Sequence, residues 1–205
     1  MRILVACERS GIVRDAFKAR GHDAWSCDLA PAERAGQHHQ CDVRDLMAQR
    51  WDMVIAHPTC TYLCNSGVRW LYGGKGTTRD PIRWAQMEAA AAFFRLMLDW
   101  PCDRVAVENP IMHKYALRLV GRFHDQIIQP HWFGDPESKA TALWLKGLPN
   151  LRPTKRLKLP ACGHWNNQTP SGQNKLAPSD DRAKLRSVTY PGIAAAMADQ
   201  WGNAL

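Results

Sequence analysis

Short apolar runs that alternate with helical patterns constrain the fold of this chain more than any other feature. Residues 2–6 are expected to form a first strand, and the runs at 53–56 and 104–107 are rich in β-branched residues. Such runs are typical of strands covered on both faces. A strong helix is expected at 81–100, where Pro81 lies near the N-terminus and the centre is rich in alanine. This alternation predicts an α/β fold with a mostly parallel sheet and helices on both faces.

The regular pattern does not extend along the whole chain. From residue 2 to residue 130 strand and helix patterns alternate, whereas 149–181 is dominated by Pro, Gly, Asn and Lys. A chain of 205 residues can bury one substantial core, and two full domains would be cramped. We therefore expect one catalytic domain over 1–205, with an irregular basic loop region at 149–181.

The composition indicates which class of partner and which cellular compartment to expect. The net charge of +8 and the pI near 9.3 favour a polyanionic partner such as nucleic acid. The chain shows no long apolar stretch and no signal-peptide pattern, so a soluble, cytoplasmic protein is expected. Seven cysteines, an odd number without framework spacing, predict reduced thiols.

Two segments with reactive side chains follow two of the expected strands. Residues 57–61 (HPTCT) come after one run, and 108–110 (ENP) come after another. In open α/β sheets, ligands bind beyond the carboxyl ends of the strands. Cys60 and Glu108 would meet at that edge, where a thiol and a carboxyl group suit a nucleophile and a general acid.

The N-terminal unit predicts a nucleoside site. Ser10 is a credible N-cap for the first helix, and Asp28 ends the second expected strand, where an acid can bind ribose hydroxyls. The turn after the first strand, at 7–11, holds only Gly11, so the pattern favours a cofactor with a nucleoside but no phosphate. Asp42 ends a third expected strand and could receive an adenine amino group or cap the helix that starts at Val43.

Taken in order, these segments resemble the cytosine C5 DNA methyltransferases, especially short phage-type members. The resemblance covers most of the chain, with a gap in the C-terminal third. The matching segments are the cofactor loop at 6–11, Asp28, the Asp42-Val43 pair, the nucleophile segment at 52–67, the Glu-Asn dipeptide at 108–109, and the last motif at 190–194.

The resemblance implies a Rossmann-like fold that binds S-adenosylmethionine. It implies that Cys60 adds to C6 of cytosine and that Glu108 protonates N3, with no metal required. Expected cofactor contacts are Ala6, Cys7, Glu8, Ser10, Gly11, Asp28, Leu29, Asp42, Val43, His57 and Ile193. Expected substrate contacts are Thr61, Asn65, Ser66, Gly67, Trp70, Asn109, Lys139 and Thr141.

The chain departs from the family pattern in three places. Thr59 replaces the second proline before the nucleophile, which leaves one fixed φ there. Residues 129–144 occupy the place of a base-clamping Gln-x-Arg-x-Arg element, of which Lys139 and Thr141 are candidate replacements. The length leaves no room for a full target-recognition domain, so weak sequence preference is expected unless a second subunit, as in a homodimer, adds contacts.

Phosphate contacts are expected from two basic segments. The glycine-rich residues 71–80 predict a mobile loop beside the nucleophile, and 152–158 (RPTKRLK) form a basic stretch. Trp70 or Tyr72 could stack on an unstacked base while the cations hold phosphates. The same charges could also form an ordinary solvated surface.

Alternative interpretations remain for the reactive residues. Cys60 could be an inert buried thiol, and Glu108 could form a salt bridge or cap a helix. A mixed zinc site could be built from His57, Cys60, Cys64, Cys162 and His164. The same methyl transfer could act on a free nucleotide, single-stranded DNA or RNA, and a catalytically silent nucleic-acid-binding protein is a further alternative.

Overall fold

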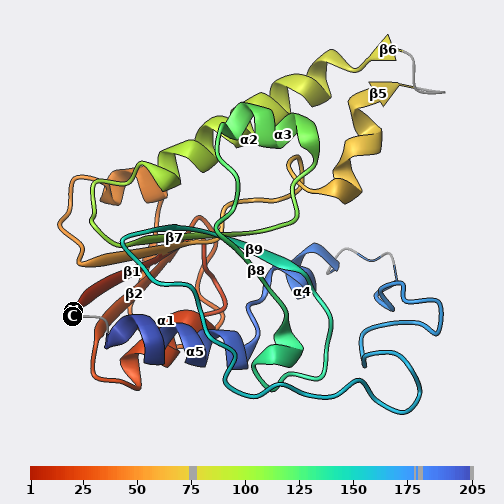
Figure 1. The fold of residues 1–205 in the computed structure, drawn as a ribbon. Helices are drawn as coiled ribbons and strands as arrows, with labels where there is room; N and C mark the ends of the chain where they lie inside the picture. Colours follow the sequence, from red (N-terminus) through yellow and green to blue (C-terminus); the bar gives the residue numbers. More distant parts are fainter. Residues whose placement is uncertain (74–77, 178, 180–181, 204–205) are drawn as a thin grey trace.

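A central seven-stranded sheet organises the molecule, shown in Figure 1. The structure, a computed structural model, describes residues 1–73, 78–177, 179 and 182–203. The strand order is β3-β2-β1-β4-β7-β9-β8. The strands are β1 (Arg2–Ala6), β2 (Asp23–Asp28), β3 (His38–Gln40), β4 (Met53–Ala56), β7 (Val105–Pro110), β8 (Gln126–Ile128) and β9 (Thr141–Lys146).

Most of the sheet is parallel, as predicted. β1 pairs in parallel with both β2 and β4, and β2–β3 and β4–β7 are also parallel. β9 runs antiparallel between β7 and β8. The chain leaves β1 for one side of the sheet and later returns to β4 on the other, so the sheet changes its winding direction there. In such sheets a crevice opens beyond the carboxyl ends of the strands at this switch point.

Helices cover both faces of the sheet, which confirms the predicted Rossmann-like α/β architecture (Figure 1). On one face lie α2 (Pro81–Leu98) and α3 (Lys114–Val120), and on the other lie α1 (Ile12–Lys18) and α5 (Pro191–Gly202). Successive strand residues point to opposite faces, so the strands contribute to two separate apolar clusters. Shorter helices are η1 (Val43–Leu46), η2 (Asn65–Leu71), η3 (Pro130–Trp132) and α4 (Arg182–Ser187).

The long helix α2 begins where the sequence predicts. The Asp80 carboxylate accepts a hydrogen bond from the Arg83 amide at 3.0 Å, and Pro81 occupies the first turn. The helix ends at Leu98, two residues earlier than predicted. Trp100, which follows, is fully buried against the same core.

Three expected element boundaries are corrected by the structure. β7 continues through Glu108 to Pro110 because antiparallel β9 pairs with these residues beyond the end of β4. β3 ends at Gln40, and the Asp42 carboxylate accepts the Arg44 amide at 2.9 Å, so η1 is a single capped turn. In the expected loop at 71–80, β5 (Tyr72–Gly73) pairs with β6 (Thr78–Arg79), while residues 74–77 lie outside the described part of the chain.

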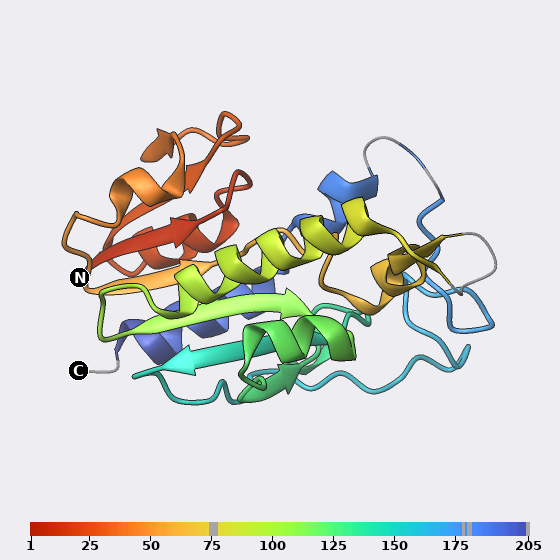
Figure 2. The ribbon, with the colours of Figure 1, turned by 90° about the horizontal axis from the view of Figure 1, so that it is seen from above.

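The expected irregular region is confirmed between β9 and α4. Across the described residues from 147 to 179, the structure contains isolated bridges and turns but no helix or regular strand. The segment is nevertheless anchored: the Lys155 amide donates to the Trp132 carbonyl at 3.1 Å, and Trp165 stacks on His131. Figure 2 shows this segment extending beyond the carboxyl ends of β1, β4 and β7, on the side opposite to Met1.

Candidate active site

The two predicted reactive segments are joined by two direct hydrogen bonds. His57 Nδ1 lies 3.0 Å from Glu108 Oε2, and Asn109 Nδ2 donates to the Pro58 carbonyl at 2.9 Å. His57 follows β4 and Glu108 lies in the neighbouring parallel strand β7. The structure therefore brings the nucleophile loop and the Glu-Asn dipeptide together, as the strand-end argument predicts.

Glu108 sits in an environment that keeps it ionised. Its side chain is 12% exposed, and burial by itself would raise its pKa. The hydrogen bond with His57 and the positive charge of Lys139 outweigh burial and lower the pKa of Glu108. The opposite ring nitrogen, His57 Nε2, is buried and has no hydrogen-bond partner among the described residues. Glu108 thus makes the kind of side-chain contact that the salt-bridge alternative foresees, and this contact with His57 lies at the edge of the sheet where the candidate nucleophile stands.

Asn109 holds the loop that carries Cys60 in place. Its side chain is buried and donates to Pro58, two residues before Cys60. This bond fixes the backbone on the proline side of the nucleophile, although Thr59 lacks the second ring constraint. Asn109 was expected to contact substrate, but its burial makes it a residue that positions the nucleophile loop.

A close backbone approach holds the other side of the loop. A Cβ atom on Gly67 would lie 2.6 Å from the Thr61 carbonyl oxygen, so only glycine fits there. Arg83 of α2 donates to the same carbonyl at 3.1 Å and packs over the Tyr62 ring. The Ser-Gly pair after the nucleophile therefore has a steric role in shaping the loop.

The two thiols of this loop differ in exposure and in pKa. Cys60 is half-buried, whereas Cys64 is 7% exposed. The Cys60 thiol and then the donors of Ser66 and Gly67 stabilise the Cys64 thiolate and lower the pKa of Cys64 to about 5. The same interaction with Cys64, together with burial, raises the pKa of Cys60. Cys60 is therefore the more accessible thiol and is held protonated in the free protein.

Two adjoining cavities lie at the carboxyl ends of β1 and β2. Their volumes are about 160 and 320 Å3, and both are lined by Cys7, Asp28 and Thr59. Burial and then the charges of Asp28 and Asp42 raise the pKa of Cys7 to about 12, so both acids act on this space. Expected cofactor contacts that line these cavities are Cys7, Glu8, Ser10, Asp28, Leu29, Asp42, Val43 and His57.

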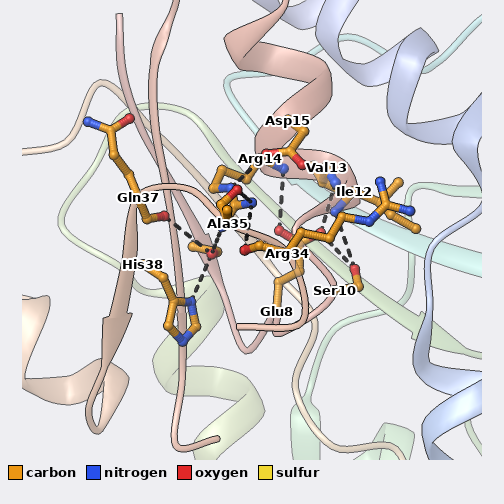
Figure 3. Close-up of polar contacts among 11 residues, drawn as sticks. Glu8, Ser10, Ile12, Val13, Arg14, Asp15, Arg34, Ala35, Gln37 and His38 are labelled. Carbon is orange, nitrogen blue, oxygen red and sulfur yellow. Dashed lines mark hydrogen bonds and ion pairs between the residues drawn. The ribbon is translucent and has the colours of Figure 1, made fainter. Parts of the chain in front are cut away.

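Glu8 fills the position at which a helix N-terminus commonly binds phosphate (Figure 3). Its carboxylate accepts hydrogen bonds from the Val13 amide at 2.8 Å, the Arg14 amide at 3.3 Å and the Ser10 hydroxyl at 3.2 Å. Cys7, with φ of +58°, turns the chain immediately before it. The amides of α1 are thus satisfied by a carboxylate from the same chain, and a ligand phosphate would meet negative charge there.

Arg14 ties the loop after β2 to α1, also in Figure 3. Its side chain is fully buried. The guanidinium donates to Asp15 Oδ1 at 2.8 Å, Ser26 Oγ at 3.2 Å, the Ala35 carbonyl at 3.1 Å and the Arg34 carbonyl at 3.4 Å. The loop held in this way begins at Asp28, so Arg14 positions one wall of the cleft without touching the cavity.

Four expected cofactor contacts are corrected. Ser10 lines the cavity but is not the N-cap; Gly11 holds that position with φ of +71°, and Glu8 provides the cap hydrogen bonds. Ala6 and Ile193 are 0% and 2% exposed in the apolar core. Ala6 contributes its backbone carbonyl, which accepts the His57 amide at 2.9 Å. Ser10 thus keeps its place at the cavity without the capping role, capping accounts for Gly11, and core packing accounts for Ala6 and Ile193.

Several residues that line the smaller cavity were not expected from the sequence, among them three from one segment near the C-terminus. Ser187, Val188 and Thr189 close it from the C-terminal side, immediately before the helix α5. Their position just ahead of the Tyr190-Pro191 motif was the available signal. The expected contact within the helix, Ile193, is replaced by this preceding segment.

The expected substrate contacts fall into two groups. Thr61, Asn65, Ser66 and Trp70 are exposed around η2, and Arg69 packs over the Trp70 ring. Lys139 lies close enough to Glu108 and Cys60 to influence both groups electrostatically. Thr141 is 3% exposed within β9 and donates to the Lys139 carbonyl at 3.1 Å, so it supports Lys139 rather than facing substrate.

The residues considered for zinc do not gather at one point. Cys162 and His164 approach each other, with Sγ and Nδ1 3.9 Å apart, on the exposed C-terminal loop. Within the residues that the structure describes, no group of three or more His, Cys, Asp or Glu side chains is arranged to hold a metal ion. None of the described helices is long and apolar enough to cross a membrane.

Comparisons with known proteins find similar solved structures but no matching sequence family. No protein-family profile matches the sequence, and no curated protein matches it. Among the solved structures that match is an E. coli protein described as a candidate DNA modification methyltransferase encoded within a prophage. It shares 16% identity over 70% of this chain with a TM-score of 0.44, and this chain spans about 45% of its length. That likeness is distant and partial, so it does not show the function of this chain.

Proposed function

We propose that this protein is an S-adenosylmethionine-dependent methyltransferase that acts on C5 of cytosine in DNA through a covalent adduct with Cys60. The observation that carries the proposal is the pair of hydrogen bonds, His57 to Glu108 and Asn109 to Pro58, that unites the Cys60 loop with the carboxylate. A thiol and an acid held together beside a nucleoside-sized cleft suit addition to a pyrimidine ring.

The acids of the cleft suit the charge and the hydroxyl groups of the proposed cofactor. S-adenosylmethionine carries a nucleoside and an electrophilic methyl group on a sulfonium, and it has no phosphate. Asp28 is placed to accept ribose hydroxyls, and Asp42 lines the adjoining cavity. Glu8 occupies the helix N-terminus, so the acidic cleft favours a cationic cofactor and disfavours a pyrophosphate.

Each residue of the site then has a defined chemical task. Cys60 passes its proton to the ionised Glu108 carboxylate and its sulfur adds to C6, which makes C5 nucleophilic toward the methyl carbon. Glu108 then gives that proton to N3 and so offsets the negative charge that develops on the ring. After the methyl group is transferred, the C5 proton is released to water, the bond from Cys60 to C6 breaks, and the N3 proton returns through Glu108 to the Cys60 thiolate.

Covalent trapping tests this proposal. A single-stranded oligonucleotide with 5-fluorocytosine should form a stable adduct in the presence of S-adenosylmethionine, because fluorine cannot leave as a proton does. Cys60→Ser should abolish the adduct, and Cys64→Ala, which changes the buried neighbouring thiol, should retain it. Mass spectrometry of the protein reads the adduct directly.

The outcomes separate the alternatives. An adduct that survives in Cys60→Ser and disappears in Cys64→Ala would move the nucleophile to Cys64. Oligonucleotide binding without any adduct would indicate a binding protein instead of an enzyme. Glu108→Gln should keep binding but slow methylation strongly, because the amide cannot deliver a proton to N3.

A further inference from the structure

A third cavity, of about 520 Å3, adjoins the proposed reaction centre. Pro110, two residues beyond Glu108, forms part of its wall, and Val188 lines both this cavity and the smaller cofactor cavity. Lys139 also lines it and acts electrostatically on Glu108 and Cys60. A molecule in this cavity would therefore lie beside the reactive pair and next to the cofactor cavity.

Three segments, at 137–140, 167–176 and 185–190, supply most of the lining. The polar and aromatic groups of this lining include the cations Lys139, Lys175 and Arg186, the amides Asn167 and Asn174, and the ring of Tyr190. Cations suit phosphate, amides suit the hydrogen-bonding edges of a base, and an aromatic ring can contact the face of a base. This combination is the chemistry of a nucleotide site.

Several hydrogen bonds build the cavity wall. The Asn167 amide group makes two bonds with the Ser138 backbone, at 2.8 and 3.0 Å, as a paired strand would. The Tyr190 hydroxyl donates to Glu137 Oε2 at 2.5 Å. Lys139 Nζ donates to the Arg186 carbonyl at 2.7 Å. These contacts hold segments from three parts of the chain around one space. Glu137 is the acidic residue of the lining, and the Tyr190 hydroxyl already binds one of its carboxylate oxygens.

We propose that this cavity binds one unpaired, phosphate-bearing nucleotide, and that residues 167–176 and 185–190 take the place of a separate recognition domain in holding it. The inference rests on the proposed function, because it names the substrate unit of that same site. The volume lies within the range of small-ligand pockets, about 300–1,000 Å3, and suits one nucleotide. A base paired within a duplex must leave its stack to enter such a space.

The stretch at 152–158 was expected to hold the phosphates, but the structure places it elsewhere. Lys155 and Leu157 pair with the backbone around η3, and Arg156 packs over the Trp132 ring. Lys158 is exposed and offers a matched control, being a lysine of the same irregular region outside the cavity lining.

Binding measurements test the assignment without requiring turnover. A fluorescent ten-nucleotide single strand with one cytosine is titrated with the full-length protein in the absence of cofactor, alone and annealed to its complement. Lys175→Ala and Arg186→Ala should each weaken single-strand binding by about tenfold, the effect of one charge-assisted contact. Each should also reduce the salt slope by about one. Lys158→Ala should change neither value.

Competition identifies the source of the nucleotide. Deoxycytidine monophosphate should displace the strand about tenfold better than deoxycytidine, because only the former carries the phosphate. Displacement by the monophosphate at concentrations near the Kd of the strand would show a free nucleotide as the source. Displacement only far above that Kd would show a polynucleotide as the source.

Three results would overturn the proposal: equal affinities of wild type, Lys175→Ala and Arg186→Ala; equal competition by nucleoside and nucleotide; or equal affinities for single strand and duplex. Repeating the titration with Cys60→Ser separates this inference from the proposed function. If the wild-type protein binds the strand normally but forms no adduct, only the covalent chemistry is contradicted. If the adduct forms and the Lys175→Ala and Arg186→Ala variants bind the strand as tightly as the wild type, only the assignment of this cavity is contradicted.

Discussion

The cofactor cleft and the proposed nucleotide cavity share Val188 but differ in charge and in construction. The cleft is lined by acids, among them Glu8 and Asp28, and its walls include strand ends and the loops that follow them. The nucleotide cavity is lined by cations, and its walls come largely from chain without regular structure. A protein with a net charge of +8 thus keeps an acidic site for a cationic cofactor beside a basic site for a phosphate.

The two regions should also differ in how much stability depends on single side chains. In the cleft, buried charged groups hold α1 and the loop after β2 together. In the cavity, the cations Lys175 and Arg186 are exposed. Removing a buried hydrogen-bonded charge costs several kcal/mol, whereas surface changes stay within about 0.5 kcal/mol. Stability should therefore depend on the cleft, and substrate affinity on the cavity.

The largest expected effect comes from Arg14→Met. This change leaves the Ala35 and Arg34 carbonyls without their buried donor and should lower the free energy of unfolding by about 3 kcal/mol. Urea denaturation measures the difference. Arg34→Met, which changes an exposed arginine of the same loop, and Lys175→Ala should each stay within about 0.5 kcal/mol of wild type. If Lys175→Ala lowers the free energy of unfolding as much as Arg14→Met does, the two regions do not differ in the way proposed.

A somewhat smaller effect is expected for cofactor binding in the cleft. S-adenosylhomocysteine at about 100 times its Kd should stabilise the wild-type protein by about 2.7 kcal/mol. Asp28→Asn should lose most of this gain, because the carboxylate charge is removed while one oxygen remains to accept the Ala30 amide. Thermal denaturation with and without ligand measures the gain. Asp23→Asn, at the exposed start of the same strand, should keep the full shift.

The effect of pH on Glu108 should be the smallest of the three. Its folded-state pKa is lowered by His57, so its ionisation stabilises the fold above the unfolded-state pKa and this stabilisation is lost as pH falls through the folded-state pKa. In His57→Phe, burial is no longer offset by that hydrogen bond, and the pKa of Glu108 should rise. The free energy of unfolding should then increase less between about pH 3 and 6 than in the wild-type protein.

A control variant sharpens the interpretation of that pH series. His57→Gln retains a side-chain donor and should keep more of the wild-type pH dependence than His57→Phe does. If the free energy of unfolding falls identically at acid pH in the wild type and in His57→Phe, the hydrogen bond from His57 does not control the ionisation of Glu108.

Several features of the fold and site were accessible from local sequence. β4 matches the predicted run at 53–56 because a buried parallel strand has a continuous apolar pattern. The start of α2 follows from Asp80 and Pro81, which satisfy the first turn locally. The approach of the Cys60 loop to Glu108 follows from the rule that parallel strands place their carboxyl ends at one edge.

Other features depended on partners distant in sequence. β7 runs through Glu108 because antiparallel β9 pairs with it, and that pairing has no local signal. Ser10 was assigned as the N-cap because serine commonly caps helices, but the turn at Cys7 brings the Glu8 carboxylate to the same amides. A charged acceptor makes the stronger hydrogen bond, so Glu8 takes that role.

Sequence by itself determined the alternation of strands and helices, the parallel sheet, and the pairing of a thiol with a carboxylate at its edge, because periodicity and strand polarity are local properties. Tertiary structure alone decided that Ile193 packs in the core, that Ser187 and Thr189 close the cleft, and that an irregular region encloses a cationic cavity. These outcomes rest on hydrogen bonds such as Asn167 to Ser138 and Tyr190 to Glu137, which join residues 29 and 53 positions apart. Contacts over such separations are set by how the whole chain packs, and no short pattern encodes them.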